Sequence, residues 1–451
     1  MHVILLGTLD TKRAEVLYLH SQLHQTATRL NTPLEITLID CGVRGTSESH
    51  SAITVSHADL ITKYPHTPDP ESSSPGDEKE KDLFALPRGD AISILTACAT
   101  RCVSELLKAK DVHGIIGTGG SGGTSLISAV MRSAAPIGLP KLIVSTVASG
   151  NTGPIVGETD LTLMYSVVDI AGSNRLLRDV MGNAAGAMVG MASAYKARLD
   201  ERKSKSTTCS PEQKEERKSR VGITMFGVTT PCVDAIRSHL EKTYAVEVYV
   251  FHATGHGGKA MERLVAEGHL DAILDLTTTE ICDLIAGGEM ACDQSRLETS
   301  LKKGIPTIIS VGATDMVNFG PIETVPPKYQ GRRLFVHNPS VTLMRTSREE
   351  CEGVGRFIVD KVRGCVGEDK AGLVEVWIPR GGVSGISTTG GAFEDKEADG
   401  ALADVLTAGL ESRVRVVQDQ RDVNDVGFAV DIAERLMALV AAAGHREIES
   451  K

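Results

Sequence analysis

The sequence predicts an α/β protein built from two doubly wound, Rossmann-like domains with mostly parallel sheets. Short β-branched or aliphatic runs alternate with longer stretches of helical periodicity, which is the pattern of βαβ units. The same rhythm restarts after a polar stretch near the middle of the chain. At 451 residues the chain exceeds the usual size of one domain, which also favours more than one.

The first domain is predicted to span residues 1–200. Its expected strands are residues 2–6, 35–40, 113–117, 141–145 and 161–165. Helical periodicity is found between most of them, around 12–25, 91–108 and 124–133, and a long Ala-, Gly- and Met-rich helix is expected at about 173–199. The segment 64–82 is rich in proline, serine and charge, so we predict a surface insertion that buries no core.

A polar linker is predicted over residues 201–220, and the second domain over residues 221–451. The second domain repeats the alternation and ends in an expected helix at 423–443. Its predicted strands are residues 221–226, 246–251, 271–275, 305–311, 373–377 and 413–417.

Composition disfavours several classes of function. The net charge is −10 with no extended basic patch, which argues against nucleic acid as the main partner. Nine scattered cysteines without a CxxC pair read as reduced thiols in a cytoplasmic protein. Cys98 and Cys102 lie one helical turn apart, which can suit a metal, but buried thiols are the favoured interpretation and no metal site is predicted. The apolar N-terminal run is too short for a signal peptide or a membrane span.

The strongest local signal is a glycine- and hydroxyl-rich loop at Gly117–Ser125, between a short apolar strand and a helical stretch. Glycines let backbone N–H groups face a ligand, and a helix N-terminus attracts anions. The loop is not a Walker A motif, because no lysine follows its last glycines, and it does not follow the first strand as a dinucleotide fingerprint would. A tight packing turn is the alternative. The predicted phosphate-binding residues are Gly119, Gly120, Ser121, Gly122, Gly123, Thr124 and Ser125.

Two more loops are expected at the same carboxyl edge, where ligands bind in open α/β sheets. They follow the first strand, at Gly7–Lys12, and a later strand, at Ser145–Asn151. Either alone would be an ordinary turn or helix cap, but three such loops predict a nucleotide pocket. They add the candidates Gly7, Thr8, Asp10, Thr11, Thr146, Ser149 and Gly150. Asp169 is a further candidate for holding a ribose or a metal, with a helix cap as the alternative.

The second domain offers polar side chains at its own predicted strand ends. Acid–base groups, metal ligands and ordinary loop hydrogen bonding are all open interpretations for them. The candidates are His252, His256, Asp293 and Asp315. Cys232 is placed near a predicted helix start, where the pKa of a thiol can fall, although a packed thiol is the simpler reading.

At these motifs the sequence resembles the plant family of tobamovirus-replication inhibitors and its bacterial and fungal homologues, an ATP-binding-domain family with uncharacterised members. Beyond the three loops, the matching strings are Val221–Val233, Phe251–Gly258, Met290–Asp293 and Ser310–Gly320. The resemblance implies two Rossmann-like domains, a homodimer, and ATP bound by the N-terminal domain. It places the nucleotide contacts on residues 7–11, 119–125 and 146–150.

Three functions follow from these patterns. The first is an ATP-binding protein that turns over a second small molecule, with Mg²⁺ offsetting the triphosphate charge because few Lys or Arg accompany the glycine loops. The second is a non-catalytic, nucleotide-regulated interaction protein, favoured by the absence of a recognisable base or P-loop lysine. The third, a Rossmann-type oxidoreductase, is disfavoured by the missing fingerprint. The sequence leaves the reaction open.

Overall fold

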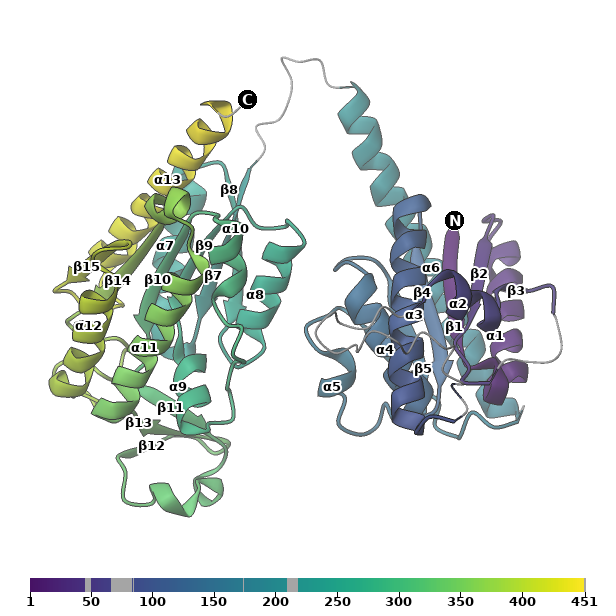
Figure 1. Ribbon diagram of the computed structural model, residues 1–451, viewed down its shortest axis with the longest axis horizontal. Helices are drawn as coiled ribbons and strands as arrows, with labels where there is room; N and C mark the ends of the chain where they lie inside the picture. The colour runs from purple at the N-terminus through teal and green to yellow at the C-terminus, as the bar shows by residue number, and fades with distance from the viewer. Residues whose placement is uncertain (45–49, 66–82, 84, 173, 209–217, 450–451) are drawn as a thin grey trace, which may run out of the picture. The chain divides into compact units, whose positions relative to one another are not determined.

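A computed structural model describes residues 1–44, 50–65, 83, 85–172, 174–208 and 218–449. The chain forms two compact units, Met1–Gln213 and Lys214–Lys451. Each is an α/β unit with a six-stranded sheet, which confirms the predicted fold class (Figure 1). The predicted insertion at 64–82 falls, apart from its first two residues, outside the described residues.

The N-terminal sheet is parallel throughout, in the order β3-β2-β1-β4-β5-β6. The strand order therefore reverses between β1 and β4, and the crevice above that point is where such sheets bind ligands. Five strands match the predicted runs, and β3 is an addition. The strands are β1 (His2–Gly7), β2 (Glu35–Asp40), β3 (Ile53–Val55), β4 (Gly114–Gly119), β5 (Lys141–Ser145) and β6 (Thr162–Tyr165).

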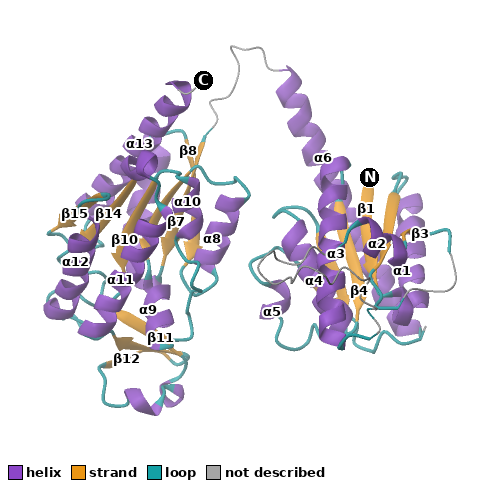
Figure 2. Ribbon diagram, viewed as in Figure 1, coloured by secondary structure: helices purple, strands orange, loops and turns teal. Residues whose placement is uncertain are grey.

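Helices cover both faces of this sheet, as Figure 2 shows. Odd and even residues of β1 point to opposite faces, so Val3 and Leu5 belong to one apolar cluster while Ile4 and Leu6 belong to another. The first cluster is completed by α1 and α6, and the second by α3 and α4. The helices are α1 (Leu9–Arg29), α2 (His57–Lys63), α3 (Arg88–Ala109), α4 (Ser121–Ala134), α5 (Gly153–Val156) and α6 (Arg175–Thr208).

The C-terminal sheet is also parallel, in the order β15-β14-β10-β9-β7-β8, and reverses between β7 and β9. Its strands are β7 (Ser219–Met225), β8 (Val246–His252), β9 (Ala272–Thr277), β10 (Thr307–Gly312), β14 (Val374–Pro379) and β15 (Arg415–Asp419). The helices are α7 (Thr230–Thr243), α8 (Gly257–Ala266), α9 (Thr279–Ala286), α10 (Glu298–Lys303), α11 (Arg348–Cys365), α12 (Lys396–Leu410) and α13 (Val426–Glu449).

Two features differ from the sequence prediction. A small antiparallel sheet, in the order β11-β13-β12, is inserted after β10; its strands are β11 (Met316–Phe319), β12 (Leu334–Asn338) and β13 (Val341–Arg345). In addition, α6 continues to Thr208, into the stretch predicted as a linker. Glu201, Arg202 and Lys203 at the start of this extension are good helix formers, and the i,i+4 ion pair of Lys196 with Asp200 stabilises the turn just before it.

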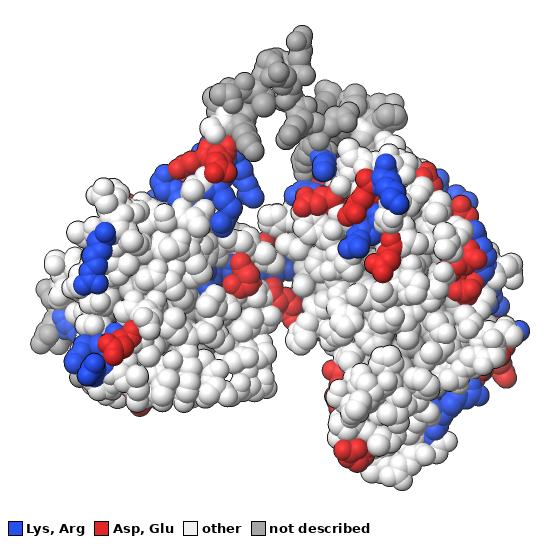
Figure 3. All heavy atoms as spheres, turned by 180° about the vertical axis from the view of Figure 1, so that it is seen from behind, with Lys and Arg blue, Asp and Glu red and all other residues white. Residues whose placement is uncertain are grey.

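The surface charges are mixed. On the face drawn in Figure 3, basic and acidic side chains lie beside one another rather than in one continuous patch of a single sign. Within the residues described, no helix combines the length and apolar character needed to cross a membrane.

Candidate functional site

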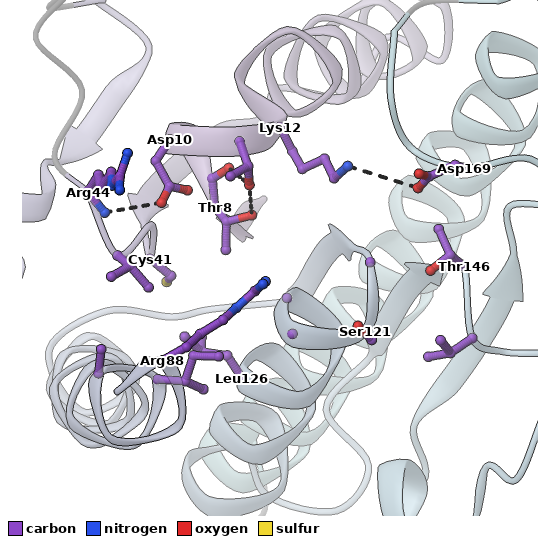
Figure 4. Close-up of a pocket in the computed structure, with 18 of the residues that line it drawn as sticks. Thr8, Asp10, Lys12, Cys41, Arg44, Arg88, Ser121, Leu126, Thr146 and Asp169 are labelled. Carbon is purple, nitrogen blue, oxygen red and sulfur yellow. Dashed lines mark hydrogen bonds and ion pairs between the residues drawn. The ribbon is translucent and has the colours of Figure 1, made fainter. Parts of the chain in front are cut away.

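A cleft of about 900 Å³ opens at the carboxyl edge of the N-terminal sheet. It lies where the strand order reverses between β1 and β4, and the loops after β1, β4 and β5 all reach it. Figure 4 shows side chains from these separate loops facing one space. The predicted residues that line it are Thr8, Asp10, Thr11, Gly120, Ser121, Gly122, Gly123, Thr146 and Asp169.

The start of α4 forms one wall of this cleft. The N–H of Thr124 donates to the carbonyl of Gly120 at 2.8 Å, so the N–H groups of residues 121–123 have no carbonyl partner within the helix. Gly120 has space beside it, because a Cβ built there would meet nothing nearer than Thr146 Oγ1 at 3.9 Å. The first turn of α4 therefore offers exposed backbone donors and the positive end of a helix dipole.

Other residues of the predicted set shape the loops instead of lining the cleft. Gly119 allows a close approach, since a Cβ there would lie 2.9 Å from Gly123 Cα. Thr124 is fully buried, and its hydroxyl bonds Ser145 Oγ at 2.7 Å. The predicted contacts absent from the lining are Gly7, Gly119, Thr124, Ser125, Ser149 and Gly150.

Three cations line the cleft: Lys12, Arg44 and Arg88. This corrects the expectation that few Lys or Arg accompany the glycine loops. The Arg88 Nη2 atom lies against the first turn of α4, 3.3 Å from the position of a Cβ on Gly122. Lys12 Nζ lies 3.9 Å from Asp169 Oδ1 across the cleft (Figure 4). The two arginines were missed because they follow other strands and are distant from the glycine loops in sequence.

Asp10 supplies a partly unsatisfied carboxylate to the same space. Its Oδ2 accepts the N–H of Arg44 at 3.1 Å, whereas its Oδ1 is buried and has no hydrogen-bond partner in the described part of the chain. The hydroxyls of Thr8 and Thr11 lie nearby, 3.2 Å from each other. Carboxylate and hydroxyl oxygens are hard ligands, so this donor set fits Mg²⁺.

Apolar side chains line other parts of the cleft, and the sequence did not point to them. One group, from the segment before α3 and from α3 and α4, consists of Leu83, Leu86, Ala91, Ile92 and Leu126. A second group lies at the end of β6 and just after it, and includes Tyr165, with 41% of its surface exposed, and Val167, with 56%. Val167 has a left-handed backbone with φ 65°, which is rare for a β-branched residue. The cleft thus pairs cationic and hydroxyl groups with apolar surface.

Three of the second-domain candidates, His252, His256 and Asp293, lie around the start of α8. His252 stacks on Phe226 with ring centroids 5.4 Å apart, and His256 is the residue preceding α8. Asp293 bonds the neighbouring Ser295 and lies 3.5 Å from Lys259.

Asp315, the fourth candidate, is fully buried and accepts the Ser384 hydroxyl at 2.7 Å. Burial raises the pKa of Asp315 to about 7, with partial compensation from Arg345. The loop carrying the two histidines is itself held from beneath, since Glu280 Oε1 accepts the N–H groups of Gly255 and Gly258. Protein groups therefore hold both Asp315 and the histidine-bearing loop in place.

Seven of the eight cysteines in the described part of the chain are buried, and Cys365 is half-buried. Burial raises the pKa of Cys232, so the lowered thiol pKa considered for it is wrong. Burial likewise raises the pKa of Cys102 to about 11. Among the residues that the structure describes, no group of three or more His, Cys, Asp or Glu is placed to hold a metal ion.

Fold and cleft together define a two-domain α/β protein with Rossmann-like sheets and a glycine-loop cleft in its first domain. The chain belongs to the uncharacterised protein family UPF0261: residues 1–197 match the family's N-terminal domain and residues 218–440 its C-terminal domain. The resemblance drawn from the sequence motifs is confirmed by these matches and by the relatives below.

Its relatives include bacterial and plant proteins. A UPF0261 protein of Clostridium tetani is 40% identical, with 97% of this chain and 98% of that protein covered. The ToMV resistance protein Tm-1(GCR237) of Solanum lycopersicum is 39% identical over 99% of this chain, which spans 57% of the tomato protein. Among solved structures, the UDP-GlcNAc 2-epimerase from Neisseria meningitidis matches at 10% identity and a TM-score of 0.19, over 68% of this chain and 82% of that one.

Proposed function

We propose that the N-terminal domain binds a nucleoside triphosphate, ATP with Mg²⁺, in the cleft between the β1 and β4 loops. The observation that carries this proposal is the convergence of two kinds of anion-binding group at the strand reversal. The first turn of α4 offers backbone donors, and Lys12, Arg44 and Arg88 line the same space. Donors of this kind, at a helix N-terminus and on cations, suit a polyphosphate.

The cleft suggests an orientation for the nucleotide. The phosphates would lie on the first turn of α4 beside Arg88, with Mg²⁺ held by Asp10 and the threonine hydroxyls to supply charge neutralisation. The base would pack on the apolar group that includes Leu86 and Leu126. The choice of adenine rests on the family resemblance, because apolar contact alone does not distinguish one base from another.

A non-catalytic role for the nucleotide is the second candidate. The described lining contains no histidine or glutamate. Of its two carboxylates, Asp169 lies 3.9 Å from the Lys12 ammonium, and Asp10 has one oxygen bonded by the Arg44 amide and the other available to Mg²⁺. A general base within reach of an attacking group is therefore not evident. In this version ATP orders the domain and controls a partner surface without turnover.

Calorimetric titration of the full chain with ATP, GTP and NAD, each with and without Mg²⁺, tests the proposal. Selective and Mg²⁺-sensitive ATP binding is expected. Arg88→Gln removes a charge-assisted contact and should weaken ATP binding by about tenfold or more, whereas Lys108→Gln, exposed on the same helix, should not. Binding of NAD in preference to ATP, or equal affinity in both variants, would contradict it. Phosphate release by the wild-type protein separates the enzyme from the regulator.

A further inference from the structure

A second, smaller cleft of about 250 Å³ lies at the carboxyl edge of the C-terminal sheet. β14 ends at Pro379, and the loop from Arg380 to Asp395 leads from there into α12. This loop is rich in glycine, serine and threonine and joins a strand to a helix, as does the loop before α4. The sequence did not single it out, and none of the second-domain candidates above lines the cleft.

The wall of this cleft is a preformed piece of backbone. A Cβ on Gly381 would lie 2.6 Å from Asp422 N, and one on Gly391 would lie 2.4 Å from Ile386 O, so both positions require glycine. Ser387 Oγ accepts the N–H groups of Val383 and Ser384, each at 2.9 Å. These contacts fix the loop without help from a ligand.

Two cations, Arg380 and Lys396, and one carboxylate, Asp399, line this cleft. The guanidinium of Arg380 makes no hydrogen bond or ion pair within the described residues and lies over α12, 4.0 Å from the position of a Cβ on Gly400. Lys396 is exposed, with Glu394 at 3.6 Å. The half-buried carboxylate in the lining, Asp399, is already bonded by Arg345 at 2.5 Å. The α12 N-terminus is capped by Asp395, which accepts the Ala398 N–H, so the attraction for an anion comes from the side chains.

We propose that this cleft binds a small, hydroxylated organic anion. Arg380 and Lys396 hold its carboxylate or phosphate group, and the polar side chains of Thr389 and Gln420, which also line the cleft, meet its hydroxyls. The volume of about 250 Å³ is below that of pockets for drug-sized ligands, so the ligand is a molecule of a few carbon atoms.

Thermal unfolding of the full chain, titrated with glycerol 3-phosphate, glycerate and glycerol at constant ionic strength, tests this proposal. Glycerol 3-phosphate carries a phosphate group and glycerate a carboxylate group, and glycerol is the uncharged control of similar size. Anions are expected to raise the unfolding midpoint, and the stronger of the two identifies the head group. Arg380→Gln and Lys396→Gln should each weaken the apparent affinity by about tenfold. The control Arg356→Gln changes an exposed arginine of α11 outside the cleft.

The N-terminal cleft is identical in all these variants. Stabilisation by the anions that persists in Arg380→Gln therefore comes from the N-terminal cleft, and the part of the wild-type stabilisation that this variant loses comes from the C-terminal cleft. Three results would overturn the proposal. They are an equal response to glycerol, a wild-type response in both Arg380→Gln and Lys396→Gln, and a loss in Arg356→Gln as large as in Arg380→Gln.

Discussion

Within the described residues, the N-terminal sheet leaves its crevice at the strand reversal open, whereas the C-terminal sheet covers the corresponding crevice, between β7 and β9, with its own chain. The carbonyl of Val228, in the loop after β7, accepts the N–H of Gly385 and the side-chain amide of Asn424, each at 3.0 Å. The N–H of Ala313, which follows β10, donates to the carbonyl of Val383 at 2.8 Å. The segment 383–385 thus lies where a ligand would sit in the first unit.

The polar groups at the carboxyl edges of the two sheets therefore have different partners. In the C-terminal unit Thr229 bonds Thr277 at 2.8 Å, and Ser384 bonds Asp315. In the N-terminal unit Arg88 and the first turn of α4 face the cleft. A hydroxyl or carboxylate at a strand end therefore indicates a ligand only when no other loop satisfies it, and strand-end position alone does not separate the two cases.

The largest predicted effect comes from glycine substitutions at the two edges. Gly120→Val fills open space beside the α4 donors, so it should weaken ATP binding by at least about 30-fold and leave stability near wild type. Gly312→Ala places a Cβ 2.4 Å from Leu276 O at the covered edge, so it should destabilise the protein by about 2 kcal/mol or more and spare ATP binding. Calorimetry and urea unfolding measure the two effects.

Gly190→Val is the control for the first variant, because nothing lies within 4 Å of the new Cβ on the exposed face of α6. Unchanged ATP affinity in Gly120→Val would remove α4 from the binding site. Loss of ATP binding in Gly312→Ala without unfolding would contradict the proposal, because it would place the nucleotide in the C-terminal domain.

Burial of Asp315 at the covered edge predicts a pH dependence of stability. Its pKa is about 7 in the folded protein and 3.8 ordinarily, so the folded state binds the extra proton. Its stabilising contribution is complete below pH 4 and is lost as the pH rises through 7. From pH 5 to 8 the wild-type protein should lose stability relative to Asp315→Asn, by at most about 1.4 kcal/mol per pH unit.

Urea unfolding of both proteins at each pH measures this difference. Asp283, whose pKa burial also raises to about 7, is present in both proteins, so the comparison isolates Asp315. Asp404→Asn, on an exposed position of α12, is the matched control and should keep the wild-type pH profile. Parallel profiles for Asp315→Asn and wild type would show that Asp315 is charged in its covered position.

Much of the fold could be predicted because the central strands are continuous apolar runs. β1 and β10 are buried along their whole length, as parallel strands covered on both faces must be. β3 has only three residues, and β12 is largely exposed, with Val336 at 55%. Neither leaves a periodic signal in the sequence, which is why these two strands were missed.

The candidate site was predictable only where its groups are local in sequence. Gly120 and Ser121 could be predicted from the sequence because glycines and hydroxyl residues cluster between a strand and a helix. Arg44 and Arg88 reach the same cleft only because β2 and α3 are folded beside β1 and β4, and that placement depends on strand order. The surroundings of Asp315 could not be predicted for the same reason, because its partner Ser384 is 69 residues away.

The smallest predicted effect concerns two residues with a left-handed backbone conformation, one at each sheet edge. They are Val167, with φ 65°, and Ala313, with φ 57°. Val167 is β-branched and mostly exposed, so Val167→Gly relieves strain of about 1–2 kcal/mol and loses little packing; Gly entropy of about 0.5–1 kcal/mol opposes this. A net gain of up to about 1 kcal/mol in urea unfolding is expected. Ala313→Gly also relieves backbone strain, but it loses a buried methyl group worth about 0.8 kcal/mol. The two effects offset each other, so its stability should stay near that of the wild type. Because Val167 lines the open cleft, only its variant should change ATP affinity, and a change in Ala313→Gly instead would mean that the covered edge also contacts the nucleotide.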